Sequence, residues 1–133
     1  MRIVLDTNVL ISAVFFGGKP QKIIDAVMWE KLSAYATNEI ITEYVEVVSE
    51  MIARKQGHLR HGLLNPFLAK LHIIDTYTQV SFCRDPDDDK FLSCAIDASV
   101  PYIVSGDKDL LTIEEYKDIK IVTAAEFCDL LKL

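Results

Sequence analysis

Short apolar stretches alternate with longer amphipathic ones along this chain of 133 residues. Two short apolar runs with β-branched residues predict strands, RIVLD (2–6) and PYIVS (101–105), and two weaker runs predict two more, SAYA (33–36) and IKIVT (119–123). Between and after them, apolar residues recur with the period of a helix. We predict helices over roughly Asn8–Phe16, Pro20–Glu30, Asn38–Lys55, His61–Lys70, Pro86–Ser99, Lys108–Ile113 and Ala124–Leu131.

The alternation of strands and helices predicts the fold class. Parallel strands need a crossover between them, and short strands that alternate with helices are typical of an α/β fold with a parallel sheet. The chain length and the 50% hydrophobic composition suit one domain with its own core. No linker, repeat or low-complexity tract interrupts the pattern. We therefore expect residues 1–133 to form a single α/β domain.

The net charge limits the kinds of binding partner to expect, and the cysteine content indicates the cellular compartment. The formal net charge of -6 argues against binding to nucleic acid or anionic membranes through bulk charge alone. The three cysteines are odd in number and lack a CxxC spacing, so neither a disulfide framework nor a zinc site is indicated. The apolar run VLISAVFF (9–16) is too short to span a bilayer. We expect a cytoplasmic protein without a membrane partner, and a solvated loop at its basic cluster, Arg54–Gly62.

The segment RDPDDDKFLSCA (84–95) places four aspartates within five residues at the start of a predicted helix. Asp85 is suited to the N-cap position and Pro86 to the first helical residue. Acids in the first turn also interact favourably with the helix dipole. These effects explain most of the charge here, but they leave open the direction in which each carboxylate points.

Helical geometry singles out Asp88 among these acids. At about 100° per residue, Asp88 falls near the middle of the apolar stripe of this helix, and Asp87 and Asp89 fall at its edges. The stripe consists of Phe91, Leu92, Ala95 and Ile96. A carboxylate that faces a core is costly unless it is paired or bound to metal, so Asp88 is a candidate site residue. The alternative is that the first turn of the helix leaves Asp88 hydrated.

Further acids follow two of the predicted strands. Asp6 ends the first strand, and Asp107 and Asp109 follow PYIV in the segment SGDKDLL (105–111). The carboxyl ends of parallel strands are where α/β proteins bind ligands, although Asp6 by itself is also a good helix cap. Together with Asp88, these positions direct carboxylates toward one side of a sheet. Helix capping can explain each acid by itself, but it does not explain why all of them lie on the same side of the sheet.

The long helix predicted over Asn38–Lys55 offers a fourth acid. Its glutamates lie opposite a broad apolar face, which is typical of a solvated stripe. Glu43 lies closest to the border of the apolar face. Helical spacing alone does not decide whether Glu43 is a surface residue or belongs to the site.

Several motifs resemble, in order, those of the PIN domain, in particular its VapC-like branch of toxins from toxin–antitoxin systems. They are DTNVLIS (6–12), a glutamate inside the next long helix, DPDDDKFLSCA (85–95) and YIVSGDKDLL (102–111). The resemblance covers nearly the whole chain and implies a PIN-like three-layer α/β/α sandwich with a central parallel sheet. It also implies a Mg²⁺- or Mn²⁺-dependent endoribonuclease acting on single-stranded RNA, a homodimer, and a cognate antitoxin protein as partner.

By position, the resemblance carries the family's acidic quartet onto Asp6, Glu43, Asp88 and Asp107. Asn8 and Ser105 accompany the first and the last acid, and Ser105 stands where many relatives have threonine. The third acid has two possible registers. Counting back from Ala95 gives Asp88, whereas counting back from Ser105 favours Asp89.

Clustered carboxylates without a neighbouring His or Cys favour one or two Mg²⁺ or Mn²⁺ ions, because these cations prefer oxygen ligands. Bound ions would relieve the repulsion among the acids, orient a scissile phosphate and activate a water molecule. We expect Asp85 to support the site as a helix cap, and we keep Asp89 and Asp109 as alternative ligands. Arg84, Lys90 or the loop Arg54–His61 could contact the RNA backbone.

Three other functions fit parts of the pattern. A receiver domain, which is a signalling module, needs an acid pair after the first strand, where LDTN (5–8) offers one acid, and a late lysine. A haloacid-dehalogenase-type phosphatase needs a second aspartate where Asn8 stands. The third alternative is a PIN-like binding or structural protein without activity. The presence of all four acids favours the enzyme over this alternative.

Overall fold

The computed structural model of the chain describes residues 1–55 and 61–133. The middle of the basic segment Arg54–Gly62, expected to be a loop, lies outside the described residues. Within them the chain forms a six-stranded sheet in the order β3-β2-β1-β4-β6-β5. The strands are β1 (Arg2–Leu5), β2 (Ser33–Ala36), β3 (His72–Ile73), β4 (Tyr102–Val104), β5 (Glu115–Tyr116) and β6 (Ile119–Val122).

The sheet is parallel except at one edge, where β5 pairs with β6 in the antiparallel direction. β1 lies in the interior of the sheet between β2 and β4, and its last residue, Leu5, is the register partner of Val104. The four strands predicted from sequence are all present. β3 and β5 were not predicted, because two residues are too few to show a strand period.

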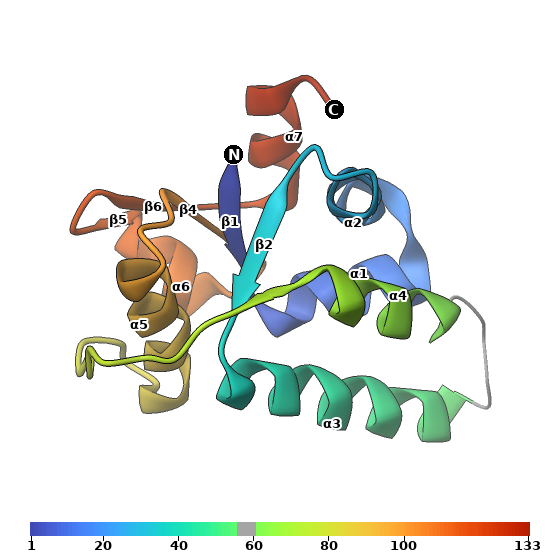
Figure 1. The fold of residues 1–133 in the computed structure, drawn as a ribbon, viewed down its shortest axis with the longest axis horizontal. Helices are drawn as coiled ribbons and strands as arrows, with labels where there is room; N and C mark the ends of the chain where they lie inside the picture. Colours follow the sequence, from blue (N-terminus) through green and yellow to red (C-terminus); the bar gives the residue numbers. More distant parts are fainter. Residues whose placement is uncertain (56–60) are drawn as a thin grey trace.

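Helices cover both sides of the sheet (Figure 1). One side of β1 and β2 is covered by α5, and the other side by α1, α2 and α4. The helices of the described residues are α1 (Thr7–Phe16), α2 (Gly18–Met28), α3 (Asn38–Lys55), α4 (Leu64–Lys70), α5 (Asp89–Asp97), α6 (Lys108–Ile113) and α7 (Ala124–Leu131), with 3₁₀ turns η1 (His61–Leu63) and η2 (Pro86–Asp88). The predicted α/β class with a central parallel sheet is confirmed, and the sheet is parallel except for the edge strand β5.

The predicted helix bounds match the structure for α3, α6 and α7. The single helix predicted over Pro86–Ser99 is wrong. Its first residues form η2, which is closed by a hydrogen bond of 3.0 Å from the backbone N–H of Asp88 to the carbonyl of Asp85. The α-helix begins only at Asp89 and ends at Asp97, because Ser99 has a φ of 54°, which a right-handed helix does not allow.

Three further helix bounds differ by smaller amounts. The first helix begins at Thr7, one residue before the predicted start. The second runs over Gly18–Met28 rather than Pro20–Glu30, and Glu30 has a φ of 60° that excludes it from a helix. The fourth begins as the 3₁₀ turn η1 and becomes α-helical only at Leu64. These shifts do not move the residues predicted for the site.

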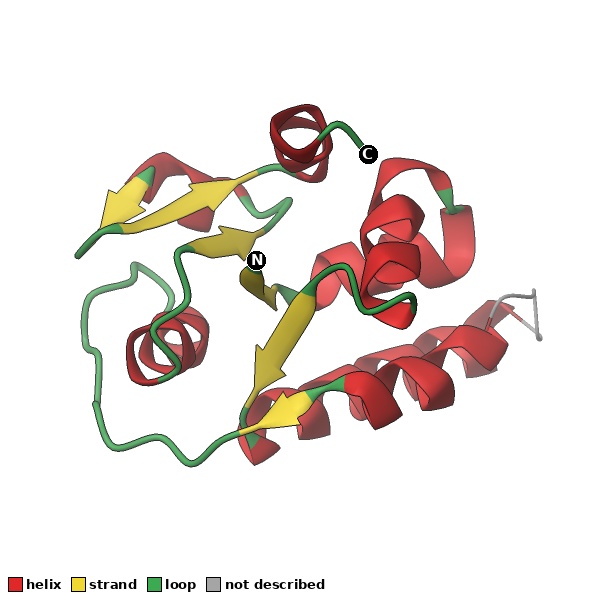
Figure 2. Cartoon of the chain, turned by 45° about the horizontal axis from the view of Figure 1, so that its top comes forward, coloured by secondary structure: helices red, strands yellow, loops and turns green. Residues whose placement is uncertain are grey.

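A long segment without regular structure connects β3 to α5 and passes around the outside of that helix (Figure 2). Three polar side chains of α5, spaced four residues apart, hold its backbone. Asp97 accepts hydrogen bonds from the N–H groups of Tyr77 and Thr78, at 2.7 and 2.9 Å. Ser93 accepts from the N–H of Val80, and Asp89 accepts from the N–H groups of residues 82 and 83. The polar side chains on the outer face of α5 thus accept hydrogen bonds from backbone N–H groups that have no strand partner.

The centre of the molecule is a continuous apolar core that reaches the carboxyl ends of the strands. Tyr44 on α3 is fully buried, and its hydroxyl donates a hydrogen bond of 2.5 Å to the carbonyl of Leu5 at the end of β1. Burial raises the pKa of Tyr44 well above its usual value, so the hydroxyl keeps its proton and remains a donor. This bond fixes α3 against the end of β1. Of the helices in residues 1–55 and 61–133, none is long and apolar enough to cross a membrane.

Candidate functional site

Four acidic residues line one pocket at the carboxyl ends of the central strands. The pocket has a volume of about 320 Å³. It is lined by Asp6, Thr7, Asn8, Ile11, Glu43, Val47, Asp88 and Asp107. The structure thus brings together the four acids of the predicted quartet, which come from four different segments of the chain. Their roles as ligands or catalytic groups remain predictions.

Asp6 is the most buried of these acids, with 6% of its surface exposed. It directly follows β1, and its backbone N–H continues the sheet by donating to the carbonyl of Val104 at 2.9 Å. Asp6 occupies the N-cap position of α1, yet its side chain makes no capping hydrogen bond. Burial raises the pKa of Asp6 to about 6, against a hydrogen bond from Ser105, and the negative charges of Asp107 and Glu43 raise it further. The capping alternative for Asp6 is therefore not realised, and its carboxylate faces the pocket.

Ser105 connects the first and the last acid of the pocket. Its fully buried hydroxyl donates to a carboxylate oxygen of Asp6 at 2.7 Å and accepts from the backbone N–H of Asp107 at 2.9 Å. Asn8 adds a second link, because its Oδ1 accepts from the N–H of Gly106 at 3.1 Å. Both residues predicted to accompany the acids thus hold the turn after β4 against the start of α1.

Asp88 and Asp107 face each other across the pocket. Asp88 is half-buried, and burial raises its pKa to about 7. A hydrogen bond between its side chain and that of Asp107 raises the pKa as well, as do the negative charges of Asp107, Asp6 and Asp85. The Asp88 carboxyl therefore binds a proton more readily than an isolated aspartate does. This arrangement is typical of acids that are destabilised without a cation.

The neighbouring acids of the aspartate run do not line the pocket. Asp89 turns away, and its Oδ1 accepts from the backbone N–H groups of Phe82 and Cys83 at 3.1 and 2.7 Å. Burial alone would raise the pKa of Asp89, but these hydrogen bonds outweigh it and lower the pKa. Asp85 caps η2, as the sequence predicts, by accepting from the N–H of Asp87 at 3.0 Å. The geometry therefore favours Asp88 over Asp89 as the third acid.

Asp109 also stands outside the pocket. Its backbone N–H donates to Asp107 at 3.3 Å, so that Asp107 caps the short helix α6. Its carboxylate lies 3.8 Å from the guanidinium of Arg84, whose side chain is 87% exposed. Asp109 is thus placed to orient the loop that carries Asp107 rather than to contact a ligand of the pocket.

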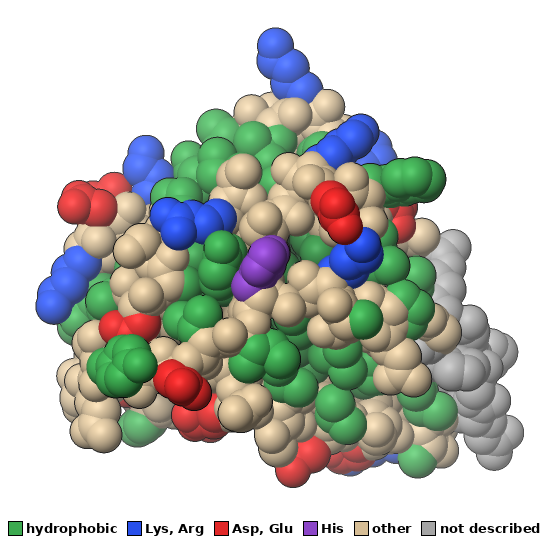
Figure 3. Space-filling view, in the orientation of Figure 1, with side chains coloured by type: hydrophobic (Ala, Val, Ile, Leu, Met, Phe, Trp, Pro, Cys, Tyr) green, Lys and Arg blue, Asp and Glu red, His purple; other side chains and the backbone are tan. Residues whose placement is uncertain are grey.

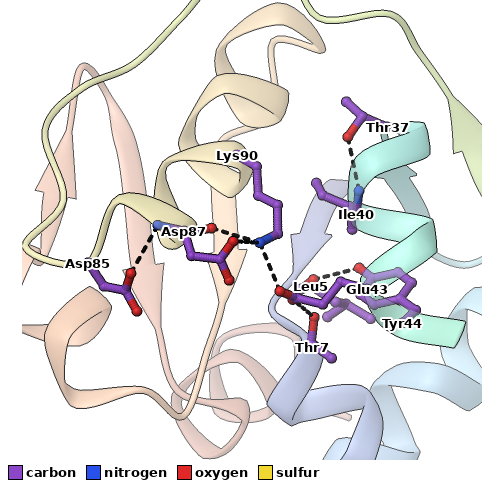
Figure 4. A network of polar contacts seen from close by, with 9 residues as sticks. All are labelled: Leu5, Thr7, Thr37, Ile40, Glu43, Tyr44, Asp85, Asp87 and Lys90. Atoms are coloured by element: carbon purple, nitrogen blue, oxygen red, sulfur yellow. Dashed lines mark hydrogen bonds and ion pairs between the residues drawn. The ribbon is translucent and has the colours of Figure 1, made fainter. Parts of the chain in front are cut away.

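Glu43 enters the pocket from α3 and is held by two partners that sequence analysis did not identify (Figure 4). One carboxylate oxygen accepts a hydrogen bond from the hydroxyl of Thr7. The other lies 2.8 Å from the ammonium of Lys90, which also lies 2.9 Å from the carboxylate of Asp87. The helical spacing of α3 did not decide whether Glu43 is a surface residue. In the structure its side chain lines the pocket.

Lys90 corrects one expectation from the sequence. It was a candidate for contact with an RNA backbone, but its side chain is only 6% exposed. Burial alone would lower the pKa of Lys90, but hydrogen bonds to Glu43 and Asp87 outweigh it and raise the pKa, so the side chain is charged. A lysine that directly follows three acids at the start of a helix has the pattern of a surface residue, and the packing of α3 beside α5 buries it.

The donor set of the pocket fits a hard divalent cation in chemistry but is not assembled around one point. All four acids supply oxygen ligands. Burial and neighbouring negative charges raise the pKa of Asp6 and Asp88, and a bound cation would offset both effects. Even so, no three acidic, His or Cys side chains in the described part of the chain converge closely enough to hold one ion. Asp6, Asp88 and Asp107 interact with one another, whereas Glu43 is turned to Lys90.

On the side of the molecule drawn in Figure 3, the Lys and Arg side chains of the described residues do not form one continuous patch. Figure 3 shows one side of the molecule, on which the described Lys and Arg side chains are dispersed among apolar and neutral atoms. This agrees with the net charge of -6.

Comparisons with known proteins agree with the fold and with the motifs. The family model of the PIN domain matches residues 2–109. The uncharacterized protein MJ1680 of Methanocaldococcus jannaschii is 35% identical to this chain over 126 residues, which cover 91% of this chain and 81% of the relative. A solved structure of VapBC2 from Rickettsia felis, bound to a DNA fragment from its promoter, contains a chain similar in fold, with a TM-score of 0.62. The match covers 91% of this chain and 97% of that chain at 15% identity, so it speaks to fold alone.

Proposed function

Since this chain belongs to the PIN domain family, we propose that it is a Mg²⁺- or Mn²⁺-dependent endoribonuclease. The substrate class is RNA, cleaved at phosphodiester bonds within single-stranded segments. Asp6, Glu43, Asp88 and Asp107 are the proposed catalytic and metal-binding residues, with Asn8, Ser105 and Asp85 in supporting roles.

One observation carries this proposal. Four acids from four separate segments line a single pocket at the strand ends, and two of them have a pKa raised to about 6 and about 7 by burial and by their neighbours. Holding carboxylates together in this way costs stability unless a cation neutralises them. A purely structural role does not explain why a protein would retain such an arrangement.

Asp6, Asp88 and Asp107 are the residues that would hold a divalent ion first, because their side chains already interact. When bound, Mg²⁺ or Mn²⁺ supplies Lewis-acid polarisation of a phosphoryl oxygen and lowers the pKa of a nearby water. Ser105 keeps Asp6 oriented, and Asn8 keeps the turn before Asp107 in place. Arg84 directly precedes the aspartate run, and its side chain is exposed. It is the proposed contact for an RNA phosphate.

We further propose that the protein is the toxin of a toxin–antitoxin pair, acting in the cytoplasm as a homodimer bound by its antitoxin. The support is the likeness in fold to a chain of the VapBC2 complex, together with the VapC-like order of the motifs. Membership of the PIN family also removes the receiver domain and the phosphatase as alternatives.

The test is RNA cleavage by purified protein. Wild type should cut a single-stranded RNA in the presence of MnCl₂ or MgCl₂, EDTA should stop the reaction, and Asp6→Asn should be inactive while remaining folded. Cleavage that persists in Asp6→Asn would point to a contaminating nuclease. No cleavage of any RNA, together with no binding of Mn²⁺, would instead favour a PIN-like binding protein without activity.

A further inference from the structure

The most unusual group beside the proposed site is a buried cation. Lys90 lies in the first turn of α5 and has 9% of its surface exposed. Its ammonium has three oxygen partners, which are a carboxylate oxygen of Glu43 at 2.8 Å, a carboxylate oxygen of Asp87 at 2.9 Å and the backbone carbonyl of Asp87 at 2.7 Å. Burying an ammonium is costly unless its hydrogen bonds are satisfied, and all three are satisfied here.

Glu43 stands between this cation and the aspartates of the pocket. One of its oxygens is turned to Lys90 on α5, and the other accepts from the hydroxyl of Thr7, the residue next to Asp6 (Figure 4). Its side chain is 23% exposed, so it is partly open to the pocket. Glu43 therefore belongs to two groups of charges at once, although in this arrangement Lys90 holds it.

We infer that Lys90 is a positioning residue that holds Glu43 by its ammonium and competes with a divalent cation for the Glu43 carboxylate. The inference rests on the proposed function, because it takes the pocket to be a metal site. It adds that Glu43 is not a permanent member of the ligand set. Glu43 joins Asp6, Asp88 and Asp107 only by leaving Lys90, so that Lys90 sets the affinity of the site for the cation.

The partners of Lys90 make this exchange feasible. When Glu43 leaves, the ammonium retains the carboxylate and the backbone carbonyl of Asp87, which belong to the same helical segment. Neither charge is then stranded, because Lys90 keeps an anionic partner and Glu43 gains the cation. Glu43 already lines the same pocket as Asp6, and its second oxygen is held by Thr7, the residue that follows Asp6.

The inference is tested by Mn²⁺ binding, measured by calorimetry, in four proteins: wild type, Lys90→Met, Glu43→Gln and the double variant. Lys90→Met should bind Mn²⁺ more tightly than wild type by about tenfold, since a charged ligand is released to the site. Removing a nearby positive charge also strengthens cation binding in general. The Glu43→Gln background measures this general effect, because Glu43 cannot act there as a charged ligand.

The tightening caused by Lys90→Met should therefore be much smaller in the Glu43→Gln background than in the wild-type background. An equal tightening in both backgrounds would overturn the inference, since it would mean that Lys90 acts only as a distant charge. Lys70→Met is the matched control, because Lys70 also forms an ion pair, at 2.7 Å from Glu30, on another part of the surface. Its Mn²⁺ affinity should equal that of wild type.

A second measurement needs no variant of Lys90 to fold. The NMR signal of the Lys90 ammonium in wild type should shift when MgCl₂ saturates the protein, because its Glu43 partner is withdrawn. An unchanged signal at saturation would overturn the inference even if the protein binds Mg²⁺ and cleaves RNA. Failure of the proposed function is distinguishable, because it would appear as absent cleavage and absent metal binding in wild type and in Lys90→Met alike.

Discussion

The hydroxyl of Ser105 lies 2.7 Å from a carboxylate oxygen of Asp6, although the two residues are 99 positions apart in the chain. Their contact follows from the pairing of β1 with β4, in which Leu5 is the register partner of Val104. The next residue after each partner is therefore at the same edge of the sheet. Strand pairing alone thus places an acid and its hydrogen-bond donor side by side.

Replacing Ser105 by Ala should destabilise the protein by about 1–3 kcal/mol, because two polar groups lose a buried partner. It should also raise the pKa of Asp6 further above about 6, since the hydrogen bond from Ser105 lowers it. Urea unfolding and the pH dependence of cleavage measure the two effects. Ser105→Thr keeps the hydroxyl and serves as the control. If it behaved like Ser105→Ala, packing rather than the hydrogen bond would be responsible.

Asp88→Asn should abolish RNA cleavage and leave the fold intact. It should raise the melting temperature of the metal-free protein, because Asp88 is repelled by Asp107 and Asp6. Asp89→Asn should stay active and lose about 1–2 kcal/mol of stability, because its hydrogen bonds to the N–H groups of Phe82 and Cys83 lose the charge.

Assays of these two variants on the same single-stranded RNA with MgCl₂ decide the register of the third acid. An active Asp88→Asn beside an inactive Asp89→Asn would show that the register is one residue off. Asp85→Asn is the control for capping, and it should behave like wild type because Asn caps nearly as well as Asp.

Divalent metal should stabilise the wild-type fold. At a concentration of MnCl₂ about 100 times the dissociation constant, the expected gain is about 2.7 kcal/mol, seen as a rise in melting temperature. Asp6→Asn should gain much less, since it lacks a central carboxylate of the pocket. Differential scanning calorimetry with and without MnCl₂ measures both. An equal gain in the two proteins would place the ion elsewhere.

The metal-free protein should lose stability as the pH rises from about 4 to 7. The pKa values of Asp6 and Asp88 are raised in the folded state to about 6 and about 7. Between the ordinary aspartate value of 3.8 and these raised values, the folded protein therefore binds more protons than the unfolded chain. Its free energy of unfolding therefore falls with increasing pH in this range. Saturating MnCl₂ should remove this decline, because protons and the cation compete for the same oxygens. Urea unfolding at several pH values with EDTA or MnCl₂ tests this, and stability that rises with pH in EDTA would contradict it.

Asp97→Ala should loosen the segment between β3 and α5. Asp97 accepts hydrogen bonds from the N–H groups of Tyr77 and Thr78 and one of 2.6 Å from the Thr78 hydroxyl. Its loss should cost about 2–3 kcal/mol and speed proteolysis within residues 74–85, because the N–H groups of Tyr77 and Thr78 lose their acceptor. Asp97→Asn keeps one acceptor oxygen and should be milder. Limited proteolysis at one enzyme concentration compares the variants, and identical cleavage of all three proteins would refute the anchoring role.

Part of the site could be predicted from the sequence because it depends only on local order. Asp6 and Asp107 directly follow strands whose apolar runs are plain, and parallel strands end at the same edge of a sheet. The direction of Asp88 could be predicted from helical spacing, even though the first turn is 3₁₀ rather than α-helical. These features are set by residues close in the chain, so the pattern of the chain contains them.

What only the tertiary structure decided is which side chains meet across elements. Nothing in the helical pattern of α3 fixed Glu43 as an inward-facing residue, and nothing in the aspartate run marked Lys90 as buried. Both depend on α3 lying beside α5, which brings their side chains within 2.8 Å. Burial and ion pairing come from contacts between residues that are distant in the chain. A single sequence shows the chemical nature of these residues but not how close their side chains lie in the folded protein.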